Sequence, residues 1–335
     1  MKGIAHFLAG IAAATFVPGV VASAAQGSYL IALGGFFGLL PDTLDFKFAR
    51  YFEKAAAVDP DPANPDPQAI ADQIATLIDR AAESGQPVRA QLHSLKLGPD
   101  RWRQYTVRFD STRNEVAVRI GPIVNVSQMP IRQAGISSYK STKVTAKLVY
   151  TYDGELNVDI FGGPSFAFVP KPHGVEVQFL PWHRAWSHSI TLAALLGLLA
   201  GLIGGSVQAG LVAALGMSAH ILEDQLGYLG SNLWWPFTPE RSAGLKLIHS
   251  GDAIPNFLAV WTALQLILFN LDRFSAASQN RSPILEPLSF LLLAVLLPNV
   301  LLLSLYALNK RKTRLPLEAA RQADLVAEVQ ETEVG

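Results

Sequence analysis

The sequence predicts a mainly helical membrane bundle that carries an inserted, soluble α+β domain with an antiparallel sheet. Two observations lead to this fold class. Hydrophobic residues make up 50% of the 335-residue chain and charged residues only 16%. The apolar residues also gather in blocks on either side of a more polar middle. That segregation is typical of a membrane protein with a soluble insert rather than of one uniform globular core.

Six apolar runs are the candidate membrane helices, because a helix needs about 20 residues to cross the hydrocarbon. The runs at 4–24 and 286–308 are long enough and the run at 253–270 is acceptable, whereas those at 28–40, 189–204 and 207–222 are short. Short runs joined by a tight turn can form a hairpin buried in a bundle. The predicted parts are a first membrane hairpin at 1–54, the insert at 55–180, a second group of membrane helices at 181–309 and a polar tail at 310–335.

The insert begins with a proline-rich linker, since Pro60, Pro62, Pro65 and Pro67 exclude a helix there. Apolar residues at helical spacing then predict a helix over 69–82. Beyond it the period changes to two, which is typical of half-buried strands. The expected strands are 88–97, 104–109, 115–120, 143–152, 155–161 and 174–179.

Histidines and acidic residues cluster where the apolar runs begin or end. His220 and Asp224 are four apart, so a helix projects both from one face and lets both reach one metal ion. His183 and His188 flank a junction between loop and helix, where the hydroxyl of Ser187 or Ser189 can cap the helix. Two further candidates are the pair Asp42 and Asp45 after Pro41, and the early His6.

If all six runs crossed the membrane in turn, these candidate ligands would lie on one side of it. Basic residues follow the last run on that same side, at Lys310, Arg311, Lys312 and Arg314. The positive-inside rule therefore predicts that the candidate site and both termini are cytoplasmic. A rival interpretation is a secretory signal, because Lys2, an apolar run and Ala22-Ser23-Ala24 also fit a cleaved leader.

With no cysteine in the chain, a metal must be held by imidazole nitrogen and carboxylate oxygen. The predicted ligands would suffice for two divalent cations with open water positions, a pair that lowers the pKa of bound water to about 7. Arg184 could hold a phosphate or carboxylate with its fork of donors, or could simply pair with an aspartate. The plainer interpretation of each residue alone is a polar cap at a membrane interface. Joint placement favours the metal site, because ionisable groups near hydrocarbon are costly unless they are paired or functional.

In this pattern the sequence resembles the YdjM-like family of inner-membrane-associated, metal-dependent hydrolases. Five segments appear in the family's order: His6 in Ala5-His6-Phe7, Leu40-Pro41-Asp42-Thr43-Leu44-Asp45, His183 to Ser189, His220 to Asp224, and Trp235-Pro236-Phe237. The family is distantly similar to the zinc phospholipase C and single-strand nuclease group. The resemblance implies a phosphoester hydrolase with zinc, one to three ions, and these ligands: His6, Asp42, His183, His188, His220 and Asp224, with Asp45 as either a further ligand or a bridging base. Two residues separate the aspartates here, where many members have one.

The sequence thus predicts an integral, multi-pass inner-membrane hydrolase that acts on a phosphodiester or an ester, with a membrane lipid as the plausible substrate. Asp45 or Glu223 would handle the proton and Arg184 would hold the anionic oxygen. The alternative is a membrane scaffold with a structural metal, which binds a protein partner through the insert at 55–180. An ion transporter ranks last because the apolar runs hold almost no polar residues at their centres. A net charge of zero gives no reason to expect nucleic-acid binding.

Overall fold

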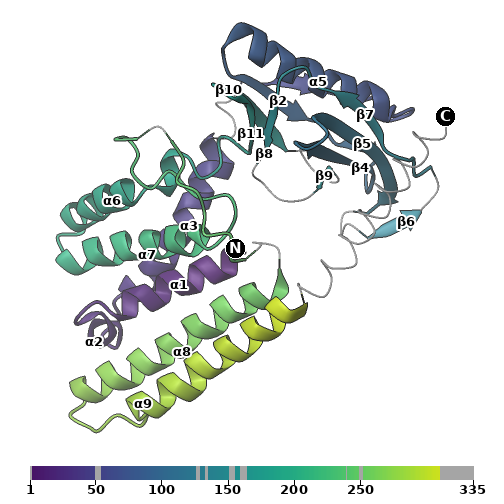
Figure 1. Ribbon diagram of the computed structural model, residues 1–335. Helices are drawn as coiled ribbons and strands as arrows, with labels where there is room; N and C mark the ends of the chain where they lie inside the picture. The colour runs from purple at the N-terminus through teal and green to yellow at the C-terminus, as the bar shows by residue number, and fades with distance from the viewer. Residues whose placement is uncertain are drawn as a thin grey trace. The chain divides into compact units, whose positions relative to one another are not determined.

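The computed structural model describes residues 2–49, 54–125, 129–132, 135–150, 155–158, 164–238, 240–248 and 252–309 (Figure 1). The described chain forms two compact units. The first unit combines Met1–Pro41 with His188–Gly335, and the second, Asp42–Ser187, is inserted between these two segments. The basic residues of the tail lie outside the described residues.

The first unit is helical. Its elements are α1 (Gly3–Thr15), α2 (Val20–Ala24), α3 (Leu30–Leu44), α6 (Ile190–Ile203), α7 (Val207–Gln225), α8 (Ala253–Ser278) and a C-terminal helix, Pro287–Asn309, that starts as α9 (Pro287–Phe290) and includes the π-helical η3 (Leu291–Leu296). Helix α3 belongs to this unit as far as Pro41. Helices α6 and α7 lie side by side, as do α8 and the C-terminal helix (Figure 1).

Three of these helices meet backbone to backbone at glycines. A Cβ atom on Gly10 of α1 would lie 2.2 Å from the carbonyl oxygen of Gly34 in α3. A Cβ atom on Gly216 of α7 would lie 2.6 Å from the same oxygen. Only glycine permits such close approach of helix backbones. This contact brings together the helices that carry His6, Gly38 and His220.

The helical hairpin of α8 and the C-terminal helix is joined by side-chain hydrogen bonds. Trp261 Nε1 donates to the carbonyl oxygen of Ala294 at 2.7 Å, and Asn299 Nδ2 donates to Thr262 Oγ1 at 2.8 Å. Near the open end of the hairpin, the Tyr306 hydroxyl donates to the Asp252 carboxylate. The pairing of these polar groups makes an otherwise apolar hairpin specific in register.

The predicted multi-helix membrane bundle is wrong. Among the described residues, only Ala253–Ser278 and Pro287–Asn309 are long and apolar enough to cross a membrane, with mean hydropathies of 1.5 and 2.5 over their most apolar windows. The run at 4–24 is interrupted because α1 ends at Thr15 and Gly19 adopts a positive φ of 79° before α2. Helices α1 and α6 have only 13 and 14 residues. Two sheets, one mixed and one antiparallel, make up much of the rest of the described chain.

The second unit consists of two sheets and one helix around a single core. The helix is α5 (Pro67–Ser84), and its N-cap is Asp66, whose side chain accepts from the backbone N–H of Gln68. The first sheet has the order β1-β2-β10-β11-β8, with the strands β1 (Ala56–Val58), β2 (Val88–Leu92), β8 (Leu148–Tyr150), β10 (Ser165–Lys171) and β11 (Gly174–Phe179). Strands β1 and β2 pair in parallel, as do β11 and β8, whereas β10 is antiparallel to both of its neighbours.

The second sheet is antiparallel and is built around the long pair β4 (Arg101–Asp110) and β5 (Glu115–Val124). Its other strands are β3 (Leu95–Gly98), β6 (Pro130–Arg132), β7 (Lys140–Lys143) and β9 (Leu156–Val158). Helix α5 and both sheets share one apolar core that includes Ile74, Tyr105 and Phe166, each at most 1% exposed. An α+β insert is therefore present, with six expected strand regions all represented, while parts of 143–152 and 155–161 lie outside the described residues.

Candidate metal centre

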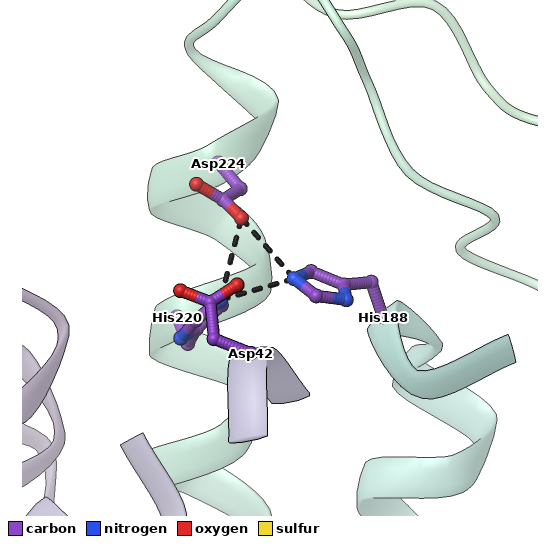
Figure 2. Close-up of side chains that lie close together, drawn as sticks. All are labelled: Asp42, His188, His220 and Asp224. Carbon is purple, nitrogen blue, oxygen red and sulfur yellow. Dashed lines mark hydrogen bonds and ion pairs between the residues drawn. The ribbon is translucent and has the colours of Figure 1, made fainter. Parts of the chain in front are cut away.

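Three predicted ligands of the first unit converge on one buried point. His220 and Asp224 lie one turn apart on α7, and His188 closes the short 3-10 turn η2 (Trp186–His188) just before α6. The Nε2 atoms of His188 and His220 are 3.1 Å apart, and Asp224 Oδ2 lies 3.3 Å from each of them. Figure 2 shows these three side chains, together with that of Asp42 from α3.

The spacing of these atoms fits a metal shell. Ligand atoms in a tetrahedral zinc site, with bonds of about 2.0–2.1 Å, lie about 3.3 Å from one another. His188, His220 and Asp224 each offer one ligand atom, and these atoms all lie within 4.8 Å of one another. The two imidazoles are fully buried and Asp224 is 2% exposed. The three residues therefore form a compact donor set of two nitrogens and one oxygen.

The tautomer of His220 is set by helix α3. Its Nδ1–H donates to the carbonyl oxygen of Gly38 at 2.6 Å, so in the neutral ring the lone pair is on Nε2 and faces His188 and Asp224. Burial, more than any other influence, lowers the pKa of His220 to about 4. The side chain is therefore neutral at physiological pH, which is the form that binds metal ions.

His6 lies on the other side of the Asp224 carboxylate. Its Nε2 is 3.4 Å from Asp224 Oδ1, and its ring stacks on that of His220 with the ring centroids 3.7 Å apart. Its Nδ1 is 2.8 Å from Glu223 Oε2, so a proton on Nδ1 would be donated to this carboxylate. Glu223, a predicted catalytic residue, thus contacts a predicted ligand and orients it in the way that carboxylates orient metal-binding histidines.

We expect Glu223→Ala to weaken metal binding about 10–100-fold, because His6 would lose the group that fixes its orientation. Glu223→Gln should weaken it less, since the amide oxygen can still accept from Nδ1–H. Competition with a chromogenic chelator would measure the affinity. Glu240→Ala, at an exposed glutamate of the same unit, is the matched control. Equal affinity in Glu223→Ala and Glu240→Ala would contradict the assigned role.

A second polar cluster lies in the second unit, centred on Asp45 in the π-helical turn η1 (Asp45–Ala49). Asp45 is fully buried, and its Oδ2 accepts from His183 Nδ1 at 2.9 Å and from the backbone N–H of Arg184 at 2.7 Å. The Ser187 hydroxyl donates to Oδ1. Arg184 has a positive φ of 58°, so this carboxylate holds a tight turn immediately before His188. Asp45 therefore stabilises the backbone turn at His183–Ser187.

Asp45→Ala should destabilise the second unit by about 3 kcal/mol, because three buried donors would lose their acceptor. Urea unfolding followed by tryptophan fluorescence would measure the loss. Glu83→Ala, at an exposed position of the same unit, should leave the midpoint unchanged. A midpoint shift no larger than that of the control would show that the turn does not depend on this carboxylate.

Ser189 connects the histidine segment to the Trp-Pro-Phe segment. Its hydroxyl accepts from the backbone N–H of Leu192, so of the two predicted caps, Ser187 and Ser189, it is Ser189 that caps α6. The same hydroxyl donates to the carbonyl oxygen of Trp235 at 2.8 Å. Within the first unit, residues from four of the five segments that carry the resemblance thus make the contacts described above. These residues are His6, His188 with Ser189, His220 with Asp224, and Trp235. Asp42 lies on α3 four residues beyond Gly38, which is about one helical turn.

The described residues define an α+β protein with a buried His/Asp cluster of metal-binding type and two helices apolar enough to cross a membrane. Residues 157–309, just under half of the chain, match the model of the YdjM inner membrane protein family. The predicted resemblance is confirmed over that range, which contains His183, His188, His220 and Asp224. No curated protein and no solved structure matches the chain. The match supports association of this protein with the membrane.

Proposed function

We propose that this protein is a membrane-associated, metal-dependent hydrolase of a phosphodiester or an ester. The observation that carries the proposal is the spacing of His188 Nε2, His220 Nε2 and Asp224 Oδ2, at 3.1–3.3 Å from one another. Three protein ligands plus a water molecule are typical of catalytic zinc sites, whereas structural sites have four protein ligands. Imidazole and carboxylate donors are compatible with Zn²⁺, which is the metal that the family resemblance implies.

Two further residues support a larger ligand set. His6 lies beside Asp224 Oδ1, so His6 and Asp224 would be able to hold a second ion, as ligands of two-metal hydrolases do. On α3, the Gly38 carbonyl contacts His220, and Asp42 follows one turn later on the same face of the helix. We therefore propose Asp42 as a further ligand. A bound divalent ion would supply Lewis acidity and an activated water molecule.

The chain's own residues would orient the metal ligands, accept the released proton and neutralise an anionic oxygen of the substrate. Glu223 fixes His6 through Nδ1 and is the proposed acceptor of the proton released in hydrolysis. Asp45, which already accepts from three donors, is better suited to orienting His183 than to proton transfer. Arg184 stays the proposed group for holding an anionic oxygen.

Turnover by the purified protein in detergent would test this proposal. Metal content is measured first, and then hydrolysis of bis(p-nitrophenyl) phosphate, p-nitrophenyl butyrate and phosphatidylglycerol, each with and without chelator. The proposal predicts chelator-sensitive turnover of at least one substrate class, and its loss in His188→Ala. A protein that binds metal stoichiometrically and hydrolyses none of them would overturn it.

One observation favours the alternative, a scaffold with a structural metal. His6, His188 and His220 are all fully buried, and a closed ligand shell is typical of structural zinc. This alternative predicts four protein ligands and no exchangeable water. Substitution of the metal by Co²⁺, whose absorption spectrum changes when water or an added anion exchanges, would distinguish the two functions.

For the membrane, we propose that α8 and the C-terminal helix cross as a hairpin. None of the most apolar window of the C-terminal helix is buried, and exposed apolar surface of that length is unfavourable in water. The basic residues after Asn309 support a cytoplasmic position for the open end of the hairpin. Because the chain has no cysteine, a single Ser282→Cys or Asp252→Cys variant reports accessibility cleanly. Labelling of Ser282→Cys from the cytoplasmic side would contradict this orientation.

A further inference from the structure

An apolar cavity of about 790 Å³ lies within the first unit, between α1, α7, α8 and the C-terminal helix. This volume falls in the range of about 300–1,000 Å³ that is usual for small-ligand sites. Alanine, leucine and other apolar side chains form most of its wall, among them Ala12, Ala259 and Leu266. Two of the four helices are the candidate membrane helices, so a ligand could enter from the bilayer.

The cavity is as long as one leaflet of hydrocarbon. Its wall on α8 extends from Pro255 to Leu266, which at 1.5 Å per residue is about 16 Å. One leaflet contributes half of the roughly 30 Å hydrocarbon thickness of a bilayer. An extended acyl chain of a membrane lipid therefore matches the cavity in both length and polarity.

The polar groups of the wall indicate the direction of the ligand. Thr262 and Asn299 hydrogen-bond to each other at 2.8 Å, so their side chains are engaged within the wall. Glu223 is the charged residue of the described lining, and its carboxylate lies 2.8 Å from His6 Nδ1. One residue thus belongs to both the apolar cavity and the His/Asp cluster.

We propose that the cavity binds one acyl chain of a lipid, with the ester or phosphoester end of that lipid at Glu223 and His6. The binding of the chain follows from the cavity itself. Its assignment as part of a substrate rests on the proposed hydrolase function. Together they define the substrate class as an acyl lipid rather than a water-soluble ester.

Binding of cis-parinaric acid, a fluorescent fatty acid, to the full-length protein in dodecyl maltoside would test this proposal. Ala259→Phe places a ring in the cavity and should weaken binding about tenfold or more, since the ring takes the volume that the chain needs. Ala194→Phe is the matched control, because Ala194 is exposed on α6 and lies outside the lining. Metal content should be equal in both variants, which would show that Ala259→Phe still folds.

Mass spectrometry of lipids extracted from the purified protein gives a second measurement. Wild-type protein and Ala194→Phe should retain lipid, and Ala259→Phe should retain much less. Equal binding and equal lipid content in the two variants, or detergent as the sole extracted occupant, would overturn the proposal. Metal-loaded protein that binds the probe but hydrolyses none of the tested substrates would refute only the hydrolase function. Active protein whose affinity for the probe is unchanged by Ala259→Phe would refute only the acyl-chain site.

Discussion

Asp224→Ala should reduce the bound metal to below about one tenth of the wild-type content. This carboxylate faces His188 and His220 with one oxygen and His6 with the other. Its removal therefore takes away the oxygen donor that lies beside all three histidines of the cluster. Asp224→Asn should also bind weakly, because a neutral amide is a poorer ligand than a carboxylate and does not balance the charge of the cation. Metal analysis of protein purified without chelator would measure both.

The control for this experiment is His93→Ala, at a half-exposed histidine of the second unit that belongs to neither polar cluster. It should retain the wild-type metal content, whereas His188→Ala and His220→Ala should behave like Asp224→Ala. Stoichiometric metal in any of the three cluster variants would refute the ligand assignment. Folding of each variant can be checked by circular dichroism, because loss of metal alone should leave the helical content nearly unchanged.

Gly34→Val should destabilise the first unit by about 3 kcal/mol or more and lower metal affinity as well. A Cβ atom at this position would lie 2.5 Å from the carbonyl oxygen of Gly10, which is far closer than atoms in contact can come. Relief requires α1 and α3 to move apart, and overpacking of this kind typically costs 1–3 kcal/mol even where side chains can adjust. Thermal unfolding and chelator competition would measure the two effects.

Gly3→Ala is the matched control on α1. Its new Cβ atom would meet only Leu39 Cδ2, at an ordinary 3.5 Å, so stability should be unchanged or rise by about 0.5–1 kcal/mol as helix propensity improves. If Gly34→Val and Gly3→Ala unfolded at the same temperature, the close glycine contact would have no part in holding α1 and α3 together. Its effect on the metal would then need another explanation.

Local spacing predicted the parts of the site that lie on one element. The interval of four residues between His220 and Asp224 places both on one face of α7, and the cap by Ser189 follows from its position before an apolar run. The carbonyl of Gly38 as the partner of His220 could not be predicted, because a backbone atom leaves no residue-type signal. The contact between Glu223 and His6 was equally hidden, since 217 residues separate them in the sequence.

The prediction of the membrane topology failed for a physical reason as well. Hydropathy measures the polarity of a segment and not its continuity, so the run at 4–24 seemed long enough although Pro18 and Gly19 interrupt it. The short runs 189–204 and 207–222 became α6 and α7, which pack on each other over glycines such as Gly197 and Gly210. In the insert, β10 was missed because Ser165–Lys171 is a nearly continuous apolar run without the alternation that identifies half-buried strands.

The pairing of His6 with Glu223 has a consequence for how the chain is made. A ribosome must synthesise more than 200 further residues before the first histidine can meet its carboxylate partner, and Asp224 follows only one residue later. Incomplete nascent chains that stop before this point cannot assemble the proposed ligand set, whatever the metal supply. Metal uptake would therefore follow the synthesis of α7, and it would distinguish chains that extend past Asp224 from shorter ones.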